Sequence, residues 1–464
     1  MLFSVLRYNN ISLICGSLVL SLAQEDIHMD TDRIQAAKAE IAATSAYQTV
    51  TGFFDEGSFC EIDAFAKSGE GFAEVVAGFG TVEGLPVYAF AQNSDVCGGA
   101  MSKAQAAKLK KLYKLALKTG APVVGFYDSV GGRLNQGTEL LAGCGEVINL
   151  TSKLSGAVPQ ISVITGTCLG TNALAAVSAD FVIMTEDAKL SLDVTGKNAD
   201  AAFNAKNGNA SFVVKDAEKA IRQAKELVCY LPSNNLNMPP EGFEEQPSPQ
   251  GSCIVSKIVD GGSKLRIADE FGDNARIRLA RLGGSVIGVV RTVGKPLDDK
   301  SAEKIAKFVR FCDAFSLPVI TFADCGGFEN LNTALRLTSA YAESTTVKIS
   351  VVVGKAVGSA YVALAGTGAN ADVVYAFPNA VISPVNVEAA ALIMAPEQMK
   401  VPVDMQKDAA EKFAQENLSA FNAAQNGYVD GIVDEAELRS ALISALDMLA
   451  GKRVPTVAKK HSTV

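Results

Sequence analysis

The sequence predicts an α/β fold built from two tandem copies of one domain. Continuous apolar strands alternate with helices, a pattern typical of α/β units with largely parallel sheets. In the first copy, residues 122–127 and 159–164 read as short buried strands, and residues 170–179 begin a helix of small residues. At 464 residues the chain is long enough for two or three domains, given a prior of about 150 residues each.

The internal repeat is clearest around one helix and the strand that follows it. Residues 104–132 read as helix, tight turn, buried strand, aspartate and glycine pair, and residues 301–327 read the same way. Further along, residues 161–184 parallel residues 349–375. The matched positions are Lys108 with Lys304, Pro122 with Pro318, Asp128 with Asp324, Gly166 with Gly354, and Gly170 with Gly358.

Proline usage places the boundary between the two copies. Five of the fifteen prolines fall within residues 231–252, which therefore read as an extended linker. We expect an N-terminal domain over residues 29–230 and a C-terminal domain over residues 253–464.

Residues 1–28 are either a leader or the product of a mis-assigned start. The apolar run 11–22 and the small residues 21–23 imitate a secretory signal peptide. Alternatively, translation starts at Met29, because the residues after it read as an ordinary polar opening helix. We favour this second reading. No later apolar run demands a membrane span, so we expect a cytoplasmic protein.

Composition argues against several classes of function. A formal net charge of −8 leaves no basic footprint for nucleic acid. Nine cysteines are scattered without a C-x-x-C pair, which argues for reduced thiols and a cytoplasmic location. Only His28 and His461 are present, both near a terminus, so we expect no Ser-His-Asp triad, Cys-His pair or histidine zinc site.

A cluster of lysines lies within one predicted helix. Its members are Lys103, Lys108, Lys110, Lys111, Lys114 and Lys118. Their spacing fits the solvated face of a helix, with contact to an anionic ligand as the alternative for part of the cluster.

Each copy has a Gly-x-x-x-Gly turn between a strand and a helix. A helix N-terminus leaves about four backbone N–H groups unpaired, and such donors can stabilise a developing negative oxygen. Glycine, serine and alanine at the turn let a ligand approach the backbone. A close crossing of helix and strand is the alternative for one copy, but two matching copies favour a functional role.

No nucleotide-binding motif accompanies these turns. The phosphate-binding pattern G-x-x-x-x-G-K-[ST] is absent. Residues 78–84, GFGTVEG, have the wrong glycine spacing for a dinucleotide fingerprint and lie between two strand-like segments, so we expect a β-hairpin there. Hydrolysis of ATP by this chain is not expected.

Several stretches together resemble the carboxyltransferase subunits of biotin-dependent acyl-CoA carboxylases and decarboxylases, such as propionyl-CoA carboxylase beta and the methylmalonyl-CoA or glutaconyl-CoA decarboxylase carboxyltransferase. They are GFGTVEGLPVYAFAQNSDVCGGAMS, GAPVVGFYDSVGGRLNQG, VPQISVITGTCLGTNALA, YLPSNNL, GKAVGSAYVAL and ADVVYAFPNAVIS. The resemblance covers residues 50–440 in the family's order. It implies two tandem crotonase-like (ClpP/crotonase) domains of the ββα superhelix type.

The resemblance also implies a chemistry that suits a chain with two histidines. Carboxyl passes between N1 of biotin and the α-carbon of a short-chain coenzyme A thioester, with propionyl-CoA and methylmalonyl-CoA as the first choice. Biotin itself is thought to act as the base. The protein then positions two reactants and stabilises two oxyanions, one on the thioester enolate and one on the biotin ureido group. No metal is expected.

Site residues follow from the family's motifs. The oxyanion pair of the N-terminal domain, on the acyl-CoA side, falls on Gly170 and Thr171, and that of the C-terminal domain, on the biotin side, falls on Ser359 and Ala360. The resemblance assigns substrate-binding roles to Gly131, Gly132, Arg133, Gly166, Gly354 and Gly358. Because the donors are backbone N–H groups, Thr171 and Ser359 can serve where the family has glycine.

This chain departs from the family in three segments. After DVTG (193–196), NADAAFNAKNGNASF (198–212) stands where the family has Gly-Pro and Gly-Gly-Ala-x-x-His, and PVNVEAAA (384–391) replaces Met-Gly-Pro-Glu-Gly-Ala. Both segments are expected near the substrate cleft, so acyl specificity stays open. EQMKV (397–401) keeps only Met-Lys of the biotin-acceptor motif and reads as surface helix.

The missing biotin-acceptor and ATP motifs imply partner chains. Biotin must arrive on a separate biotin carboxyl carrier protein, and a biotin carboxylase or membrane decarboxylase subunits would be further chains. The family's assembly implies a homo-oligomer, a hexamer, with each site completed across a dimer interface. No nucleic-acid partner is expected.

Three alternatives stay open. The same subunit could serve a sodium-pumping decarboxylase, because the oxyanion sites serve both directions of transfer. A biotin-independent crotonase-type hydratase or thioesterase would need a carboxylate at the thioester, for which Glu139 and Glu146 are the nearby candidates. A non-catalytic assembly scaffold is the third, motivated by the altered cleft segments.

Overall fold

The computed structural model describes residues 31–69, 71–248 and 253–455. The leader or alternative start predicted at residues 1–28 lies outside these residues. Residues 31–42 form a helix, as expected for the segment after Met29. No helix in the described part of the chain is both long and apolar enough to cross a bilayer.

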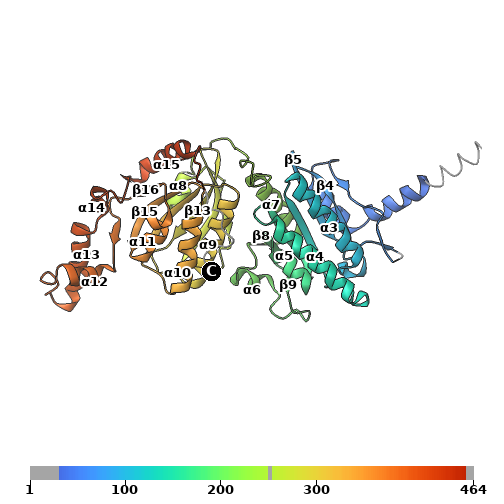
Figure 1. The fold of residues 1–464 in the computed structure, drawn as a ribbon, viewed down its shortest axis with the longest axis horizontal. Helices are drawn as coiled ribbons and strands as arrows, with labels where there is room; N and C mark the ends of the chain where they lie inside the picture. Colours follow the sequence, from blue (N-terminus) through green and yellow to red (C-terminus); the bar gives the residue numbers. More distant parts are fainter. Residues whose placement is uncertain (1–30, 70, 249–252, 456–464) are drawn as a thin grey trace, which may run out of the picture.

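The molecule is elongated, with two α/β domains side by side (Figure 1). Each domain has an eight-stranded sheet. The first sheet contains β1 (Cys60–Glu61), β4 (Val75–Val82), β5 (Leu85–Gln92), β6 (Val123–Ser129), β7 (Gln160–Leu169), β8 (Phe181–Thr185), β9 (Lys189–Ser191) and β10 (Phe212–Val214). The second contains β11 (Leu265–Ile267), β12 (Ala275–Leu282), β13 (Ser285–Thr292), β14 (Val319–Cys325), β15 (Lys348–Val357), β16 (Val373–Ala376), β17 (Val381–Ser383) and β18 (Gly431–Ile432).

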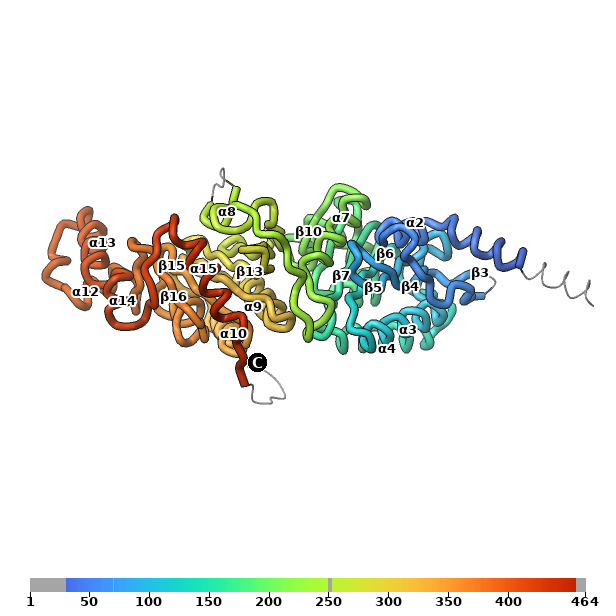
Figure 2. The backbone as a smooth tube through the Cα atoms, turned by 90° about the horizontal axis from the view of Figure 1, so that it is seen from above, coloured from blue at the N-terminus to red at the C-terminus, as the bar shows by residue number. Residues whose placement is uncertain are grey.

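Helices flank both sheets. Those of the N-terminal half are α2 (Ser45–Phe53), α3 (Lys103–Thr119), α4 (Thr138–Leu154), α5 (Thr171–Val177), α6 (Ala201–Lys206) and α7 (Ala217–Tyr230). Those of the C-terminal half are α8 (Ile254–Ile258), α9 (Asp299–Ala314), α10 (Leu331–Glu343), α11 (Ser359–Leu364), α12 (Val387–Met394), α13 (Gln406–Asn417), α14 (Ala420–Gln425) and α15 (Glu435–Leu449). Seen from above, α12 to α14 form one end of the molecule and the helix of residues 31–42 forms the other (Figure 2).

The two sheets have the same topology. The strand order is β1-β4-β5-β6-β7-β8-β10 in the first and β11-β12-β13-β14-β15-β16-β18 in the second, and β9 and β17 pair with β7 and β15. The strands from β5 to β8 run parallel, as do those from β13 to β16. This confirms the predicted α/β class and the tandem repeat.

The predicted hairpin at residues 78–84 is also confirmed. Strands β4 and β5 pair antiparallel, with Val82 opposite Leu85. Glu83 and Gly84 form the two-residue turn with φ of 50° and 77°, the left-handed pair that such hairpins need.

Local sequence signals explain where the long helices begin and end. Helix α3 begins after Ser102, whose side chain accepts the N–H of Gln105, and ends at Gly120, which adopts φ 66°. Its counterpart α9 begins after Asp298, which accepts the N–H of Ser301 in the same way. The strands that follow, β6 and β14, are buried along almost their whole length because helices cover both faces of a parallel sheet.

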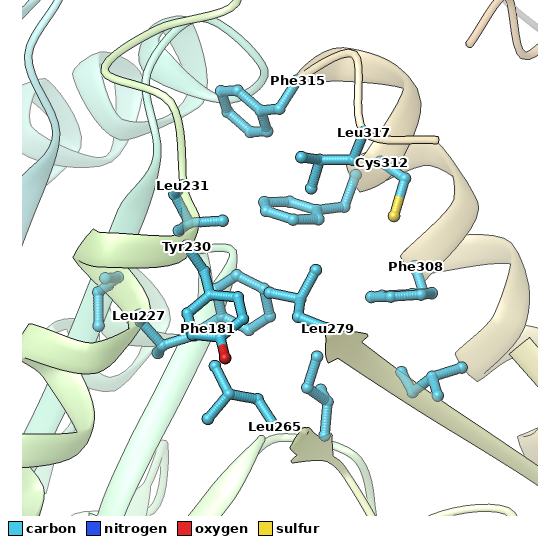
Figure 3. Packing of buried hydrophobic residues seen from close by; sticks show 14 of the residues in the cluster. Phe181, Leu227, Tyr230, Leu231, Leu265, Leu279, Phe308, Cys312, Phe315 and Leu317 are labelled. Carbon is cyan, nitrogen blue, oxygen red and sulfur yellow. The ribbon is translucent and has the colours of Figure 1, made fainter. Parts of the chain in front are cut away.

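The domains share a continuous apolar core at their junction (Figure 3). Phe181 of the first sheet and Phe311 of α9 meet edge to face, with ring centroids 4.8 Å apart. Each fully buried aromatic or aliphatic side chain contributes about 1.5–3 kcal/mol relative to exposure. The two domains therefore form one packed body rather than two units on a free tether.

Three structural details differ from the expectations drawn from the sequence or refine them. Lys108 does not lie on the solvated face of its helix: only 3% of it is exposed, and its Nζ is 2.7 Å from Glu61 Oε1. Residues 397–401 are not the expected surface helix: a turn covers residues 396–399, and Met399 is buried against α12 and α13. The described part of the expected linker, residues 231–248, contains no helix or strand.

Candidate active site

Two equivalent turns connect a central strand to a short helix. In the N-terminal domain Gly170 lies between β7 and α5, with φ 65° and ψ −140°. In the C-terminal domain Gly358 lies between β15 and α11, with φ 52° and ψ −121°. Side chains rarely adopt this conformation, so both positions require glycine for their backbone geometry.

The N–H groups of these two glycines are already used. Gly170 donates to the carbonyl of Ser191 at 3.0 Å, and Gly358 donates to the carbonyl of Ser383 at 2.8 Å. Both acceptors end the short strands β9 and β17. The glycines therefore determine the conformation of the turn. The backbone N–H groups that could still bind a ligand are those of the residues that follow each glycine.

The first two residues of each helix have backbone N–H groups with no acceptor in the described part of the chain. They are Thr171 and Asn172 in α5, and Ser359 and Ala360 in α11. In both helices the first residue is exposed and the second is buried. Of the four predicted oxyanion residues, Thr171, Ser359 and Ala360 thus keep a free donor, whereas Gly170 does not.

An aspartate braces each turn from the neighbouring strand. Asp128 Oδ1 accepts the N–H of Thr167 at 3.0 Å, and a Cβ at Gly166 would lie 2.2 Å from the same oxygen. In the second domain, Asp324 Oδ1 accepts the N–H of Lys355 at 3.0 Å, and a Cβ at Gly354 would lie 2.4 Å from it. These distances exclude any side chain, so Gly166 and Gly354 make room for the brace.

A second loop lies beside the turn of the N-terminal domain. Gly131 has φ 129°, and its N–H donates to the Ser129 hydroxyl oxygen at 3.2 Å. The buried Asn172 donates from Nδ2 to Ser129 Oγ at 2.7 Å and to the carbonyl of Gly131 at 3.0 Å. The next residue, Gly132, has a backbone N–H without an acceptor among the described residues. Asn172 thus fixes one donor-bearing loop against the helix that carries the other donors.

Arg133 anchors the far end of this loop. Its Nε lies 2.6 Å from Glu74 Oε1, and Glu74 is fully buried. Its Nη1 donates to Ser68 Oγ at 3.0 Å, and its Nη2 donates to Cys97 Sγ at 2.6 Å. These protein partners leave the guanidinium little capacity for a ligand, so the side chain holds the loop.

Residues of DVTG (193–196) and of the altered segment 384–391 contact the two turns. A Cβ at Gly170 would lie 3.7 Å from the side chain of Val194, and a Cβ at Gly358 would lie 2.9 Å from the carbonyl of Pro384. Val194 is 69% exposed. The altered segment 384–391 therefore lies against the turn of the C-terminal domain, whereas Val194 belongs to DVTG (193–196), just before the altered segment 198–212.

Titratable side chains near the turns are unsuited to act as nucleophile or base. Burial raises the pKa of the thiols of Cys168 and Cys325, which keeps both protonated at neutral pH. Glu139 and Glu146 are exposed and pair with Lys103 at 3.3 Å and Lys110 at 2.7 Å. No group of His, Cys, Asp or Glu in the described ranges is arranged to hold a metal ion.

Sequence reasoning did not assign roles to three of the side chains that build this site. Asp128 and Asp324 could have been found, because both precede a glycine pair at matching positions of the repeat. Asn172 carried no such signal, since its counterpart is Ala360. Only the fold shows that the Asn172 side chain reaches back to the Gly131 loop.

Comparison with known proteins identifies relatives that match most of the chain. Residues 43–464 match the family described as carboxyl transferase domain. The methylmalonyl-CoA decarboxylase subunit alpha of Veillonella parvula is 32% identical, over 90% of this chain and 92% of that protein. A putative propionyl-CoA carboxylase beta chain of Bacillus subtilis is 34% identical, over 90% of this chain and 93% of its own.

A solved structure of similar shape is that of the transcarboxylase 12S hexamer with hydrolysed methylmalonyl-coenzyme A bound. It superimposes with a TM-score of 0.86 and 30% identity, covering 94% of this chain and 98% of that one. This agreement across both domains confirms the tandem crotonase-like architecture.

Proposed function

This chain belongs to the carboxyl transferase family, and on that premise we propose that it transfers a carboxyl group between carrier-bound biotin and the α-carbon of propionyl-CoA or methylmalonyl-CoA. The single observation that supports this most strongly is the pair of glycine turns. Each ends in backbone N–H groups without acceptors, and the two are equivalent in the tandem domains. Two oxyanions need two such sites.

The turn of the N-terminal domain suits the coenzyme A thioester. As its enolate forms, negative charge develops on the thioester oxygen, and the N–H groups of Thr171 and Gly132 are free to donate to it. Asn172 and Arg133 hold these donors in place before substrate arrives. Because the donors are fixed, little reorganisation is needed during reaction.

The turn of the C-terminal domain fits the ureido group of biotin. Ser359 and Ala360 offer two adjacent N–H groups, and small side chains leave the backbone open to a planar ligand. When bound, biotin supplies the nitrogen that accepts or releases the carboxyl group. The residues of this chain orient that group, stabilise charge on its oxygen and exclude water.

The remaining proposals concern assembly and location. Exposed apolar residues flank both turns; they are Val130, Leu134, Leu192 and Val194 in the first domain and Leu331, Val362 and Val385 in the second. We propose that a second copy of the chain covers these faces in a hexamer and that the sites are completed there. A separate biotin carrier protein and a biotin carboxylase or membrane decarboxylase subunits would be the other partners, in the cytoplasm.

The function is tested with free biotin. Purified protein is incubated with methylmalonyl-CoA or malonyl-CoA, with and without biotin, and propionyl-CoA, acetyl-CoA and released CO2 are measured. We expect turnover that depends on biotin and is faster with methylmalonyl-CoA. An intact oligomer that shows no biotin-dependent turnover on either ester would contradict the proposal.

The direction of transfer needs a second experiment. Relatives named as decarboxylase subunit and as carboxylase beta chain are about equally similar to this chain. Affinity purification from the native cell separates the two cases. An ATP-dependent carboxylase partner indicates synthesis, whereas a polytopic membrane partner indicates decarboxylation.

A further inference from the structure

A cleft of about 970 Å³ lies between the two domains, away from the glycine turns. Its N-terminal wall includes Val177 and Ser178 at the far end of α5 from Thr171. Its C-terminal wall is formed by α9 and α10. The proposed carboxyl transfer makes no use of this space.

One buried lysine at this cleft lacks the carboxylate that its counterpart has. In the first domain Lys108 pairs with Glu61 at 2.7 Å, and the two side chains are 3% and 10% exposed. In the second domain Lys304 is equally buried, at 3% exposed, but among the described residues its Nζ donates only to the carbonyl of Ala268, at 3.2 Å. The sheet registers place Arg266 where the first domain has Glu61. A buried ammonium without a counter-ion is costly, so a bound anion would stabilise it.

Further cations line the same cleft. Lys307 and Arg310 follow Lys304 along one stripe of α9, and Arg336 faces them from α10. The carboxylates of the cleft are Asp180, Asp299 and Glu303.

Two of these carboxylates already have partners. Asp180 accepts the N–H of Gln160 at 2.8 Å, and Asp299 accepts the hydroxyl of Thr333 at 2.5 Å. Burial raises the pKa of Asp180 to about 7, so it carries only part of a negative charge at neutral pH. Because four cations and three carboxylates line the cleft and Asp180 is only partly ionised, positive charge is in excess.

The pKa of Lys304 is consistent with this environment. Burial, followed by the nearby Arg276, lowers it to about 8, although Asp269, Asp273 and Asp298 act in the opposite direction. No carboxylate lies within 4 Å of its Nζ among the described residues. A neutral fraction of this amine is thus present near pH 8.

Aromatic side chains form part of the remaining lining of the cleft. Phe181, Phe271 and Phe311 line it from both domains. We propose that this cleft binds a phosphate monoester with an aromatic body, whose phosphate contacts the lysines and arginines while its ring packs against these phenylalanines. A dianion matches the excess of cations, and guanidinium groups bind phosphate through paired N–H donors.

Pyridoxal 5′-phosphate is a probe that meets this description. Its aldehyde condenses with a neutral lysine amine to give an imine and water, and borohydride then reduces the C=N bond to a stable secondary amine. The full-length protein is treated at pH 8, reduced and digested, and labelling of each lysine is quantified by mass spectrometry. Lys219, exposed on α7, is the internal control.

We expect Lys304 to be labelled at least tenfold faster than Lys219, and phenyl phosphate to protect Lys304 but not Lys219. The double variant Arg310→Met/Arg336→Met should weaken that protection several-fold, whereas the exposed Arg222→Met should not. Lys304→Met should bind phenyl phosphate at least tenfold more weakly in calorimetry while remaining folded. Equal labelling of both lysines, or labelling that phenyl phosphate does not reduce, would overturn the proposal.

Discussion

The two glycine turns have the same backbone conformation but differ in the side chains that support it. Both have a glycine with positive φ whose N–H donates to a carbonyl of a short strand. In both, an aspartate oxygen on the neighbouring strand accepts a backbone N–H near the turn at 3.0 Å. In the first domain, Asn172 and Ser129 tie the adjacent loop to the helix. In the second domain, Ala360 and Cys325 occupy these positions, and only the thiol contacts the loop, through the carbonyl of Gly327 at 3.2 Å.

This contrast distinguishes the residues that set the conformation of the turn from those that differ between the two proposed substrate sites. The brace and the glycine recur because they set the direction of the donors. The supporting side chains diverge because a flexible thioester and a rigid bicyclic ring require different surroundings on the proposed function. In this chain the backbone geometry of the turn recurs in both domains, whereas the side-chain network around it does not.

The largest expected effect concerns the matched lysines of α3 and α9. Lys108→Met leaves the buried Glu61 without its partner, so we expect the free energy of unfolding to fall by about 3–5 kcal/mol. Lys304→Met removes a buried charge that has no carboxylate partner, so stability should be unchanged or higher. Urea unfolding followed by circular dichroism measures both. Equal destabilisation by the two substitutions would contradict the contrast.

The next effect tests the free donors. Thr171 and Ser359 occupy the first position of their helices, where proline is tolerated and its missing N–H removes one donor. We expect Thr171→Pro and Ser359→Pro each to lower kcat by about 10²–10³-fold. The matched control is Ala217→Pro at the first position of α7, which should keep full activity.

The biotin-dependent decarboxylation assay measures these variants, together with their melting temperatures. Either proline variant that kept full activity while folded would remove its turn from the mechanism. If only one lost activity, the two turns would not be equivalent in function.

The smallest expected effect concerns the network found in one domain only. Asn172→Ala removes the two hydrogen bonds that Nδ2 donates to Ser129 Oγ and the Gly131 carbonyl, which together contribute about 1–3 kcal/mol. The Met101 N–H still donates to that carbonyl at 2.8 Å, and the Gly131 N–H still donates to Ser129 Oγ at 3.2 Å. On the proposed function Asn172 positions the donors for the acyl-CoA thioester, so kcat/KM for methylmalonyl-CoA should fall while KM for free biotin stays constant. The control is Asn426→Ala, an exposed amide that donates to the Asn422 carbonyl. A rise in the KM for biotin as well would indicate general loosening instead.

Much of the fold could be predicted because it depends on local periodicity and on repetition. Residues 122–127 are apolar enough to form the buried strand β6, and Gly120 ends α3 by its own conformational freedom. The hairpin at Glu83 and Gly84 follows from turn chemistry alone. Lys108 was misplaced because helical spacing cannot show that a strand 47 residues away supplies a carboxylate.

For the site, the sequence by itself determined the two glycine turns and their equivalence. Tertiary structure alone decided which N–H groups remain free: Ser191 and Ser383 take those of Gly170 and Gly358. It also decided that Arg133 forms an ion pair with Glu74 and that Asn172 donates a hydrogen bond to the carbonyl of Gly131 in the adjacent loop. The physical reason is that a hydrogen bond depends on distance and direction, and distant segments acquire both only when the chain is folded.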